Sequence, residues 1–260
     1  MQTKLFIFVL CLCHTLCYSQ VGDSISKKFT LISIGFEAGQ GIDRYDRMNL
    51  EMMHGFTKDP ELLDRNLDGH KITADRIIEG SRVGLHLAFI PTKKNIDEKT
   101  STDEIRVGIV YSVKGTSVDY SKVESDESMY SVNYSARFKE VSLHGAYVWK
   151  FSPESARRFT FYGGIGLGIG STVYDKTSVA EHISGGQPNE IPFSIFNVYK
   201  GNSSLIVRPH IPLGIDFALM ERFDIGISGS TGIAIQKVYG GQSYLIPFGA
   251  SISAKLSYFF

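Results

Sequence analysis

The sequence has little cysteine and no excess of either charge. Its 3 cysteines, Cys11, Cys13 and Cys17, all lie near the start of a chain of 260 residues. If that segment is removed, the mature chain can form neither a disulfide nor a thiolate metal site, and cysteine-dependent catalysis is excluded. The 27 lysines and arginines balance 27 aspartates and glutamates. Because nucleic acids are bound by basic surfaces, we expect no nucleic-acid partner.

The chain also lacks a hydrophobic run long enough for a spanning helix. The apolar stretch 5–16 has about a dozen residues, whereas a helix needs about 20 to cross a bilayer. Lys4 precedes this stretch, and the small residues Cys17 and Ser19 follow it at the positions that a signal peptidase reads. The pattern predicts a signal peptide over 1–19 and a single mature domain over 20–260.

Apolar and polar residues alternate along most of the remaining chain. In 245–260, every second residue from Ile246 to Phe260 is apolar, and Ser251, Ser253 and Lys255 lie between them. A period of two is typical of a strand with one apolar and one polar face. Similar alternation occurs in 29–40, 82–90, 103–114, 140–151, 158–173, 205–219 and 222–236.

The length and spacing of these stretches indicate a membrane barrel. Strands of about 10 to 16 residues exceed the five or six typical of soluble sheets. A tilted strand crosses a bilayer in about 9 to 11 residues, and a closed barrel leaves no unpaired edge in hydrocarbon. Long links over about 41–77, 115–138 and 174–204, which would be outer loops, alternate with short ones, as in outer-membrane barrels. We therefore predict an all-β fold, an eight-stranded antiparallel up-and-down transmembrane β-barrel.

The C-terminal strand carries a family resemblance. Phe260 is preceded at every second position by an apolar residue, which resembles the signal by which Gram-negative outer-membrane barrels are recognised for assembly. The mature chain resembles the small outer-membrane β-barrel domain family, the PorT-like group, with the strand plan of the OmpA and OmpX barrels. The resemblance implies export, outer-membrane lipid around the barrel, and insertion by the barrel assembly machinery. It implies no catalytic residue. The residues that match the assembly signal are Ile252, Ala254, Leu256, Tyr258 and Phe260.

If the apolar faces contact lipid, the polar faces line the barrel interior. An eight-stranded barrel is just wide enough for its side chains to fill, so paired charges would replace a hydrophobic core. The alternative is a narrow solute path gated by those pairs. The histidines lie on separate strands without the spacing of a metal site. The ionisable residues predicted to face the interior are Glu37, Arg82, His86, Arg106, Lys114, His144, Lys150, Arg208, His210, Asp216, Asp224 and Lys255.

One long link contains a partial calcium motif. Asp64, Asn66 and Asp68 precede Gly69 with the spacing of an EF-hand-like loop, and Asp75 takes the twelfth position in place of the usual glutamate. A polar turn stabilised by local side-chain contacts is the alternative. The sequence otherwise predicts no cofactor.

Function is the least determined feature. We expect a non-enzymatic integral outer-membrane protein whose long extracellular loops recognise an envelope or secretion-system protein, or which has a structural or secretion-accessory role. A narrow channel is one alternative. A lipid hydrolase using Glu181, His182 and Ser184 is another. A soluble sandwich or lipocalin-like barrel would instead place the apolar faces inside.

Overall fold

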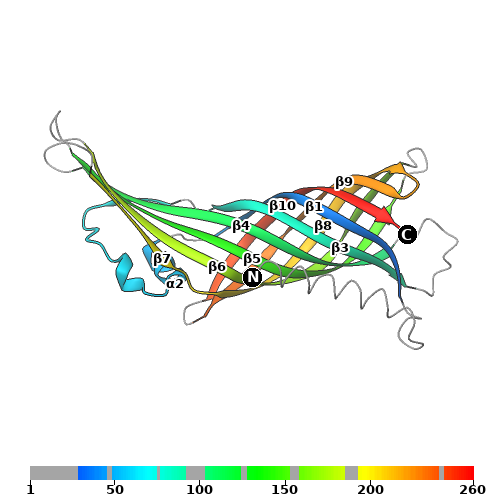
Figure 1. Ribbon diagram of the computed structural model, residues 1–260, viewed down its shortest axis with the longest axis horizontal. Coiled ribbons are helices and arrows are strands. Elements are labelled where there is room, and N and C mark those ends of the chain that lie inside the picture. Colours follow the sequence, from blue (N-terminus) through cyan, green and yellow to red (C-terminus); the bar gives the residue numbers. More distant parts are fainter. Residues whose placement is uncertain are drawn as a thin grey trace.

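A computed structural model describes residues 29–45, 49–74, 77–91, 103–123, 128–152, 158–184, 193–239 and 243–260. Most of these residues lie in antiparallel strands (Figure 1). The signal peptide predicted over 1–19 lies outside the described residues. No helix in the described ranges is long and apolar enough to cross a bilayer.

Eight long strands close into a ring, which confirms the predicted barrel. Each strand pairs antiparallel with the next, and the last pairs with the first, with Ser33 opposite Phe259. In order around the ring they are β1 (Phe29–Arg44), β3 (Ile77–Pro91), β4 (Asp103–Val123), β5 (Met129–Phe151), β6 (Phe159–Ser184), β8 (Ser204–Met220), β9 (Phe223–Val238) and β10 (Ser243–Phe259).

The two ends of the barrel differ. Strand β1 begins and β10 ends at one rim, which we call the proximal rim. Strands β3, β5 and β8 end at this rim, and the link between β8 and β9 is the turn at 221–222. At the other end, β4, β5 and β6 run on past the ring (Figure 1).

The extensions of β4, β5 and β6 form a second sheet. The prediction of loops over 115–138 and 174–204 is wrong for most of these residues, because β4 and β5 stay paired up to Val123 and Met129. Two short strands widen the sheet: β2 (Lys71–Ala74) pairs with β4, and β7 (Phe193–Lys200) pairs with β6. We call residues 49–74, 115–123, 128–139, 174–184 and 193–203 the distal lobe.

Two short helices fill the concave face of the lobe. They are the α-helix α2 (Leu50–Phe56) and the 3-10 helix η2 (Pro60–Leu63), and we call residues 49–70 the cap. The Asn49 side chain accepts a hydrogen bond from the Met52 amide at 3.0 Å, so it caps α2 at the N-terminus.

The cap closes the distal end of the barrel. Phe56 is buried, with its ring centroid 4.9 Å from that of Phe138 and 5.5 Å from that of Tyr244. The same apolar cluster reaches Ile206 on β8 and Val238 on β9. The cap therefore contacts walls from both halves of the ring.

One predicted face is wrong at the distal end of β10. The alternation in the sequence places Ile246 and Phe248 on the same apolar face. A register shift between Ile246 and Gly249 separates them, so Ile246 is fully buried while Phe248 is 43% exposed. A bulge adds one residue to a strand and reverses which face the following residues occupy.

Candidate functional site

The two faces of β5 exchange polarity part way along the strand. Between 140 and 151, the outward residues are Val141, Leu143, Gly145, Tyr147, Trp149 and Phe151, and the inward residues are Glu140, Ser142, His144, Ala146, Val148 and Lys150. Between 131 and 138 the order is reversed. Here the inward residues are Val132, Tyr134, Ala136 and Phe138, and the outward residues are Ser131, Asn133, Ser135 and Arg137. The barrel is apolar outside, whereas the lobe is apolar inside.

Exposed apolar side chains continue this outer band around the ring. Leu143, for example, is 56% exposed although it lies in the middle of a paired strand. We call this band the apolar belt. Other members with large exposed side chains are Phe36, Val83, Val107, Ile165, Leu167, Ile169, Ile211, Leu213, Ile227, Ile233, Ile252 and Leu256.

Charged side chains fill the barrel interior at three levels. At the distal level, Asp43 binds Lys114 at 2.7 Å and accepts hydrogen bonds from both terminal nitrogens of Arg208, at 2.6 and 2.9 Å. Lys114 also contacts Glu140 at 3.3 Å. All four groups are largely buried, which is tolerable only because each has a partner of opposite charge.

The middle level is built on one ion pair. A terminal nitrogen of Arg82 donates to a carboxylate oxygen of Glu37 at 2.6 Å, and the other terminal nitrogen donates to Ser251 at 2.6 Å. The Ser228 hydroxyl donates to the second oxygen of Glu37 at 3.1 Å. Strands on both sides of β1 are thereby joined across the interior.

At the proximal level, two acids share three cations. Glu104 pairs with Arg106 and with Lys150. Asp216 accepts a hydrogen bond from Lys255 at 2.6 Å and lies 3.9 Å from Arg106.

The Tyr162 ring supports two of these cations. The guanidinium carbon of Arg106 lies 4.0 Å from the ring centroid, and the Lys255 ammonium lies 4.7 Å from it. Cation–π attraction of this kind strengthens when the groups are removed from water.

The three interior histidines lie near one another without forming a metal site. The ring centroids of His144 and His210 are 5.3 Å apart, and His86 lines one interior cavity together with them. A ring nitrogen of His144 bonds the Ser142 hydroxyl at 2.8 Å, and one of His210 bonds the Arg208 carbonyl at 3.2 Å. Within the described residues, no group of three or more His, Cys, Asp or Glu side chains could hold a metal ion.

Glycines of β6 leave room for two of the histidines. A Cβ atom at Gly166 would lie 2.5 Å from the His210 ring, and one at Gly168 would lie 2.9 Å from the His144 ring. Any larger residue would displace these rings. The Gly-rich sequence of β6 thus permits large polar side chains to occupy a narrow barrel.

Little open space is left between these side chains. They enclose two cavities of about 90 and about 40 Å³, and Arg82, His144 and His210 line both. Since one water occupies about 30 Å³ in the liquid, each cavity holds at most a few waters.

Sequence reasoning missed three interior acids. The predicted residues include three acids and six Lys or Arg, but the structure adds Asp43, Glu104 and Glu140, so that six acids oppose six bases. Glu104 and Glu140 share the polar parity of their strands, which is the signal that could have found them. Among the predicted residues, Asp224 is half-buried and forms no ion pair with any residue of the described ranges.

The predicted calcium loop is held by local contacts. Asp64 pairs with His54 at 3.2 Å, and the Asn66 side chain accepts a hydrogen bond from the Asp68 amide at 3.1 Å. Gly69 has a φ of 77°, which favours glycine. Asp75 lies outside the described residues. These contacts form a polar turn, and the calcium site stays a prediction.

Two residues of the predicted hydrolase site, Glu181 and His182, point apart. Glu181 faces the cap, where it binds Arg65 at 2.5 Å and accepts a hydrogen bond from Tyr130 at 2.9 Å. His182 is exposed on the other face, because neighbouring residues of a strand alternate. The Ser184 side chain lies outside the described part of the structure. Burial raises the pKa of Tyr130, and its bond to Glu181 raises it further.

The predicted assembly signal lies on the outward face of β10, with Ile252 and Phe260 well exposed. The Phe260 amide donates to the Ile32 carbonyl at 3.1 Å, and the Tyr258 ring lies 5.1 Å from that of Phe223. An aromatic cluster thus marks the proximal end of the belt.

Comparison with known proteins adds little beyond the architecture. No family model matches the chain, and none of the curated proteins matches it. Neisserial surface protein A is a structural neighbour, with 10% identity over 89% of this chain and 99% of that chain and a TM-score of 0.38.

Two further neighbours are more distant in shape. For Ail, the attachment invasion locus protein of Yersinia pestis, the identity is 18% over 90% of this chain and 99% of that chain, with a TM-score of 0.28. For the outer membrane protease OmpT from Escherichia coli, the identity is 10% over 89% and 96%, with a TM-score of 0.23. None of these similarities carries a function to this chain, and the fold assignment rests on the strand pairing itself.

Proposed function

We propose that the protein is a non-enzymatic integral outer-membrane β-barrel that holds the distal lobe at the cell surface, where the lobe recognises an envelope or secretion-system protein. The observation that carries this proposal is the exchange of polarity along β5 between Phe138 and Val141. An apolar outer face is expected only where a strand contacts lipid, and an apolar inner face is expected where it contacts water. We therefore infer that β5 passes from lipid, around the barrel, into water, around the lobe.

The size of the apolar belt supports a membrane span. The outward apolar residues of β5 run from Val141 to Phe151. A stretch of this length matches the roughly 9 to 11 residues with which a tilted strand crosses a bilayer. The belt also lies on a ring without an open edge, as hydrocarbon requires.

The orientation follows from the same asymmetry. Outer-membrane barrels have short turns on the periplasmic side and longer segments outside. The two-residue turn at 221–222 lies at the proximal rim, whereas the lobe lies at the other end. The proposal therefore places the proximal rim in the periplasm and the lobe outside the cell, after export directed by residues 1–19.

The filled interior favours an anchor over the narrow channel. The charged side chains are paired at all three levels, and the cap lies over the distal opening. A solute would have to displace Arg82 from Glu37 to pass between the two cavities. No catalytic role is assigned, since Glu181 and His182 lie on opposite faces of β6.

The finer family assignment is part of the proposal. We propose membership of the PorT-like group and insertion by the barrel assembly machinery. Both are supported by the outward-facing residues of the assembly signal, which end at Phe260 after the strand that closes the ring. Outer-membrane lipid would surround the belt.

Cell fractionation with a heat-modifiability gel tests the proposal. We expect full-length protein in the outer-membrane fraction, with a band that shifts on boiling, and no conductance in planar bilayers. Soluble protein without a shift would overturn the membrane assignment. If the protein conducts ions and the conductance changes in Glu37→Gln or Arg106→Gln, the channel becomes the better explanation and the anchor proposal fails.

A further inference from the structure

Three basic side chains lie side by side on the outer face of the lobe. Arg137 on β5 is directly opposite Lys176 on β6, and Lys176 is directly opposite Lys200 on β7. All three are exposed. Lys139 lies two residues from Arg137 on the same face of β5.

The row borders an open depression. A groove of about 960 Å³ is lined by Arg137 and Lys176, with Phe196 and Val198 of β7 on one side. Gly115 and Ser135 are among the small residues that line it. A Cβ atom at Gly115 would approach no atom closer than 3.7 Å, so the groove is open above this residue.

The groove combines charge with exposed apolar surface. Phe196 is 68% exposed and Val198 is 47% exposed, and both lie on the outward face of β7. A free inorganic anion would make no use of these side chains. A ligand with an anionic group joined to an apolar part would contact both the cations and the apolar rim.

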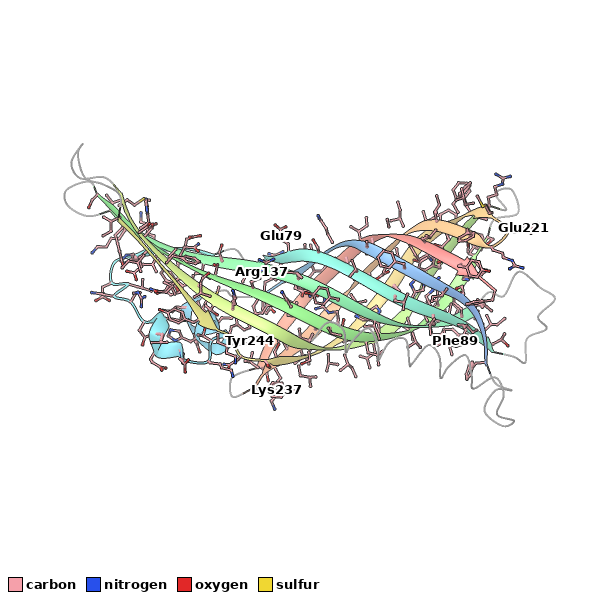
Figure 2. All side chains as sticks on the ribbon, in the orientation of Figure 1. Glu79, Phe89, Arg137, Glu221, Lys237 and Tyr244 are labelled. Carbon is pink, nitrogen blue, oxygen red and sulfur yellow. The ribbon has the colours of Figure 1, made fainter. Side chains whose placement is uncertain are left out.

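The position of the groove indicates what that ligand is. Lys139 is directly opposite Val113, which belongs to the outward face of β4. On β5 the first residue of the apolar belt, Val141, follows two positions after Lys139. The cations therefore begin where the belt ends, at the level of lipid headgroups. Figure 2 labels Arg137 and Glu79 in this region, where the barrel passes into the lobe.

We propose that Arg137, Lys139, Lys176 and Lys200, which we call the basic groove, bind the phosphorylated headgroup of a lipid in the leaflet next to the lobe. The phosphate contacts the cations and the apolar part of the lipid lies along the distal edge of the belt, while Val198 and Phe196 flank the headgroup on the side away from the belt. This site rests on the proposed membrane span. It adds a ligand class that the anchoring role by itself does not require.

Glu79 provides a test that is specific for charge. It lines the same groove, opposite Gly115, which is in turn opposite Arg137. A carboxylate at this place repels a phosphate. Replacing it by glutamine should therefore strengthen binding, whereas removal of a purely structural residue would not.

Calorimetric titration of the full-length protein, folded in a neutral detergent, tests the proposal. The probes are short-chain phosphatidic acid, phosphatidylcholine with the same chains, and inorganic phosphate. We expect phosphatidic acid to bind best. Near a membrane surface each Lys or Arg contributes about fivefold in affinity to an anionic lipid, so Arg137→Ala and Lys176→Ala should each weaken binding by about that factor. Glu79→Gln should strengthen it.

Lys237→Ala is the matched control, since Lys237 is an exposed cation on β9, away from the groove (Figure 2). Its affinity should equal that of the wild type. The proposal would be overturned if phosphatidylcholine bound as tightly as phosphatidic acid. It would also be overturned if the double variant Arg137→Ala, Lys176→Ala bound phosphatidic acid as tightly as the wild type. Equal affinity for inorganic phosphate would overturn the lipid as the ligand. A heat-modifiability gel on each sample shows separately whether the barrel itself is present.

Discussion

Three strands, β4, β5 and β6, run through both the barrel and the distal lobe, yet the two regions bury opposite kinds of residue. Along β5, Phe138 is buried with an apolar cluster, and two residues later Glu140 is buried beside Lys114. The pairing of β5 with β4 continues through this point without a register shift, whereas the pairing with β6 shifts between Lys139 and Glu140. Alternation along a strand therefore determines which residues share a face, whereas the surroundings of the strand determine which face is apolar.

The two regions also differ in what stabilises them. The lobe has an apolar core with Met53, Leu63 and Tyr134 at its centre, as in a soluble domain. Barrel side chains such as Leu143 gain stability from lipid instead, and the interior depends on ion pairs. A substitution should therefore have different effects in the two regions, and this gives three tests.

The largest effect is expected when a barrel ion pair is broken. Asp43→Asn leaves Lys114 and Arg208 buried without their shared partner. Removing one partner of a buried pair costs about 3–5 kcal/mol. Urea unfolding followed by the fluorescence of the single tryptophan, Trp149, measures this loss. In the control Asp224→Asn, which breaks no ion pair with described residues, stability should change much less. Equal losses would show that pairing does not stabilise the interior.

The next largest effect comes from placing a charge on the outer face. Leu143→Lys puts an ammonium on the distal part of the apolar belt, where the cost should lie between the roughly 0–1 kcal/mol found near a bilayer interface and the roughly 2–4 kcal/mol found at its middle. Ser131→Lys makes a similar change on the same face of β5 within the lobe, where the cost should stay within about 0.5 kcal/mol. Folding yields into lipid vesicles compare the two. If both variants fold equally well, the belt does not contact hydrocarbon.

The smallest effect should be confined to the lobe. Asn49→Ala removes the bond to the Met52 amide that begins α2, at a cost of about 1 kcal/mol. Hydrogen exchange of lobe amides should accelerate, while urea unfolding reported by Trp149 stays unchanged. Asn49→Ser keeps a capping oxygen and should exchange like the wild type. An equal loss of stability in the urea unfolding reported by Trp149 would mean that the cap and the barrel unfold together.

The sequence alone was sufficient for the barrel strands. All eight occur where alternation predicts them, since within the ring each has one face toward a uniform apolar surrounding. The extension of β4 and β5 was missed because Ser117, Asp119 and Asn133 resemble a polar loop when an apolar outer face is expected. Their inward neighbours, including Val118 and Val132, alternate equally well but with the opposite sense.

The remaining omissions depend on contacts between distant segments. Asp43 lies beyond the predicted end of its strand and is identified as an interior residue by Lys114 and Arg208, both far along the chain. The reversal at Ile246 depends on a register shift against β9, which no local pattern specifies. The Asn49 cap and the apolar residues Met53 and Phe56 did offer a local signal for α2, which the search for strands passed over.

The pairing of β10 with β1 sets a condition on how the chain reaches its native state. The contact between Ile32 and Phe260 joins residues separated by nearly the whole described chain, so it forms only after β10 has been synthesised and delivered. Contacts of such high sequence separation slow folding, because a very large loop must close before they form. A chain shortened by its last strand would not form a smaller barrel. It would expose the hydrogen-bonding edges of β1 and β9, which favour aggregation.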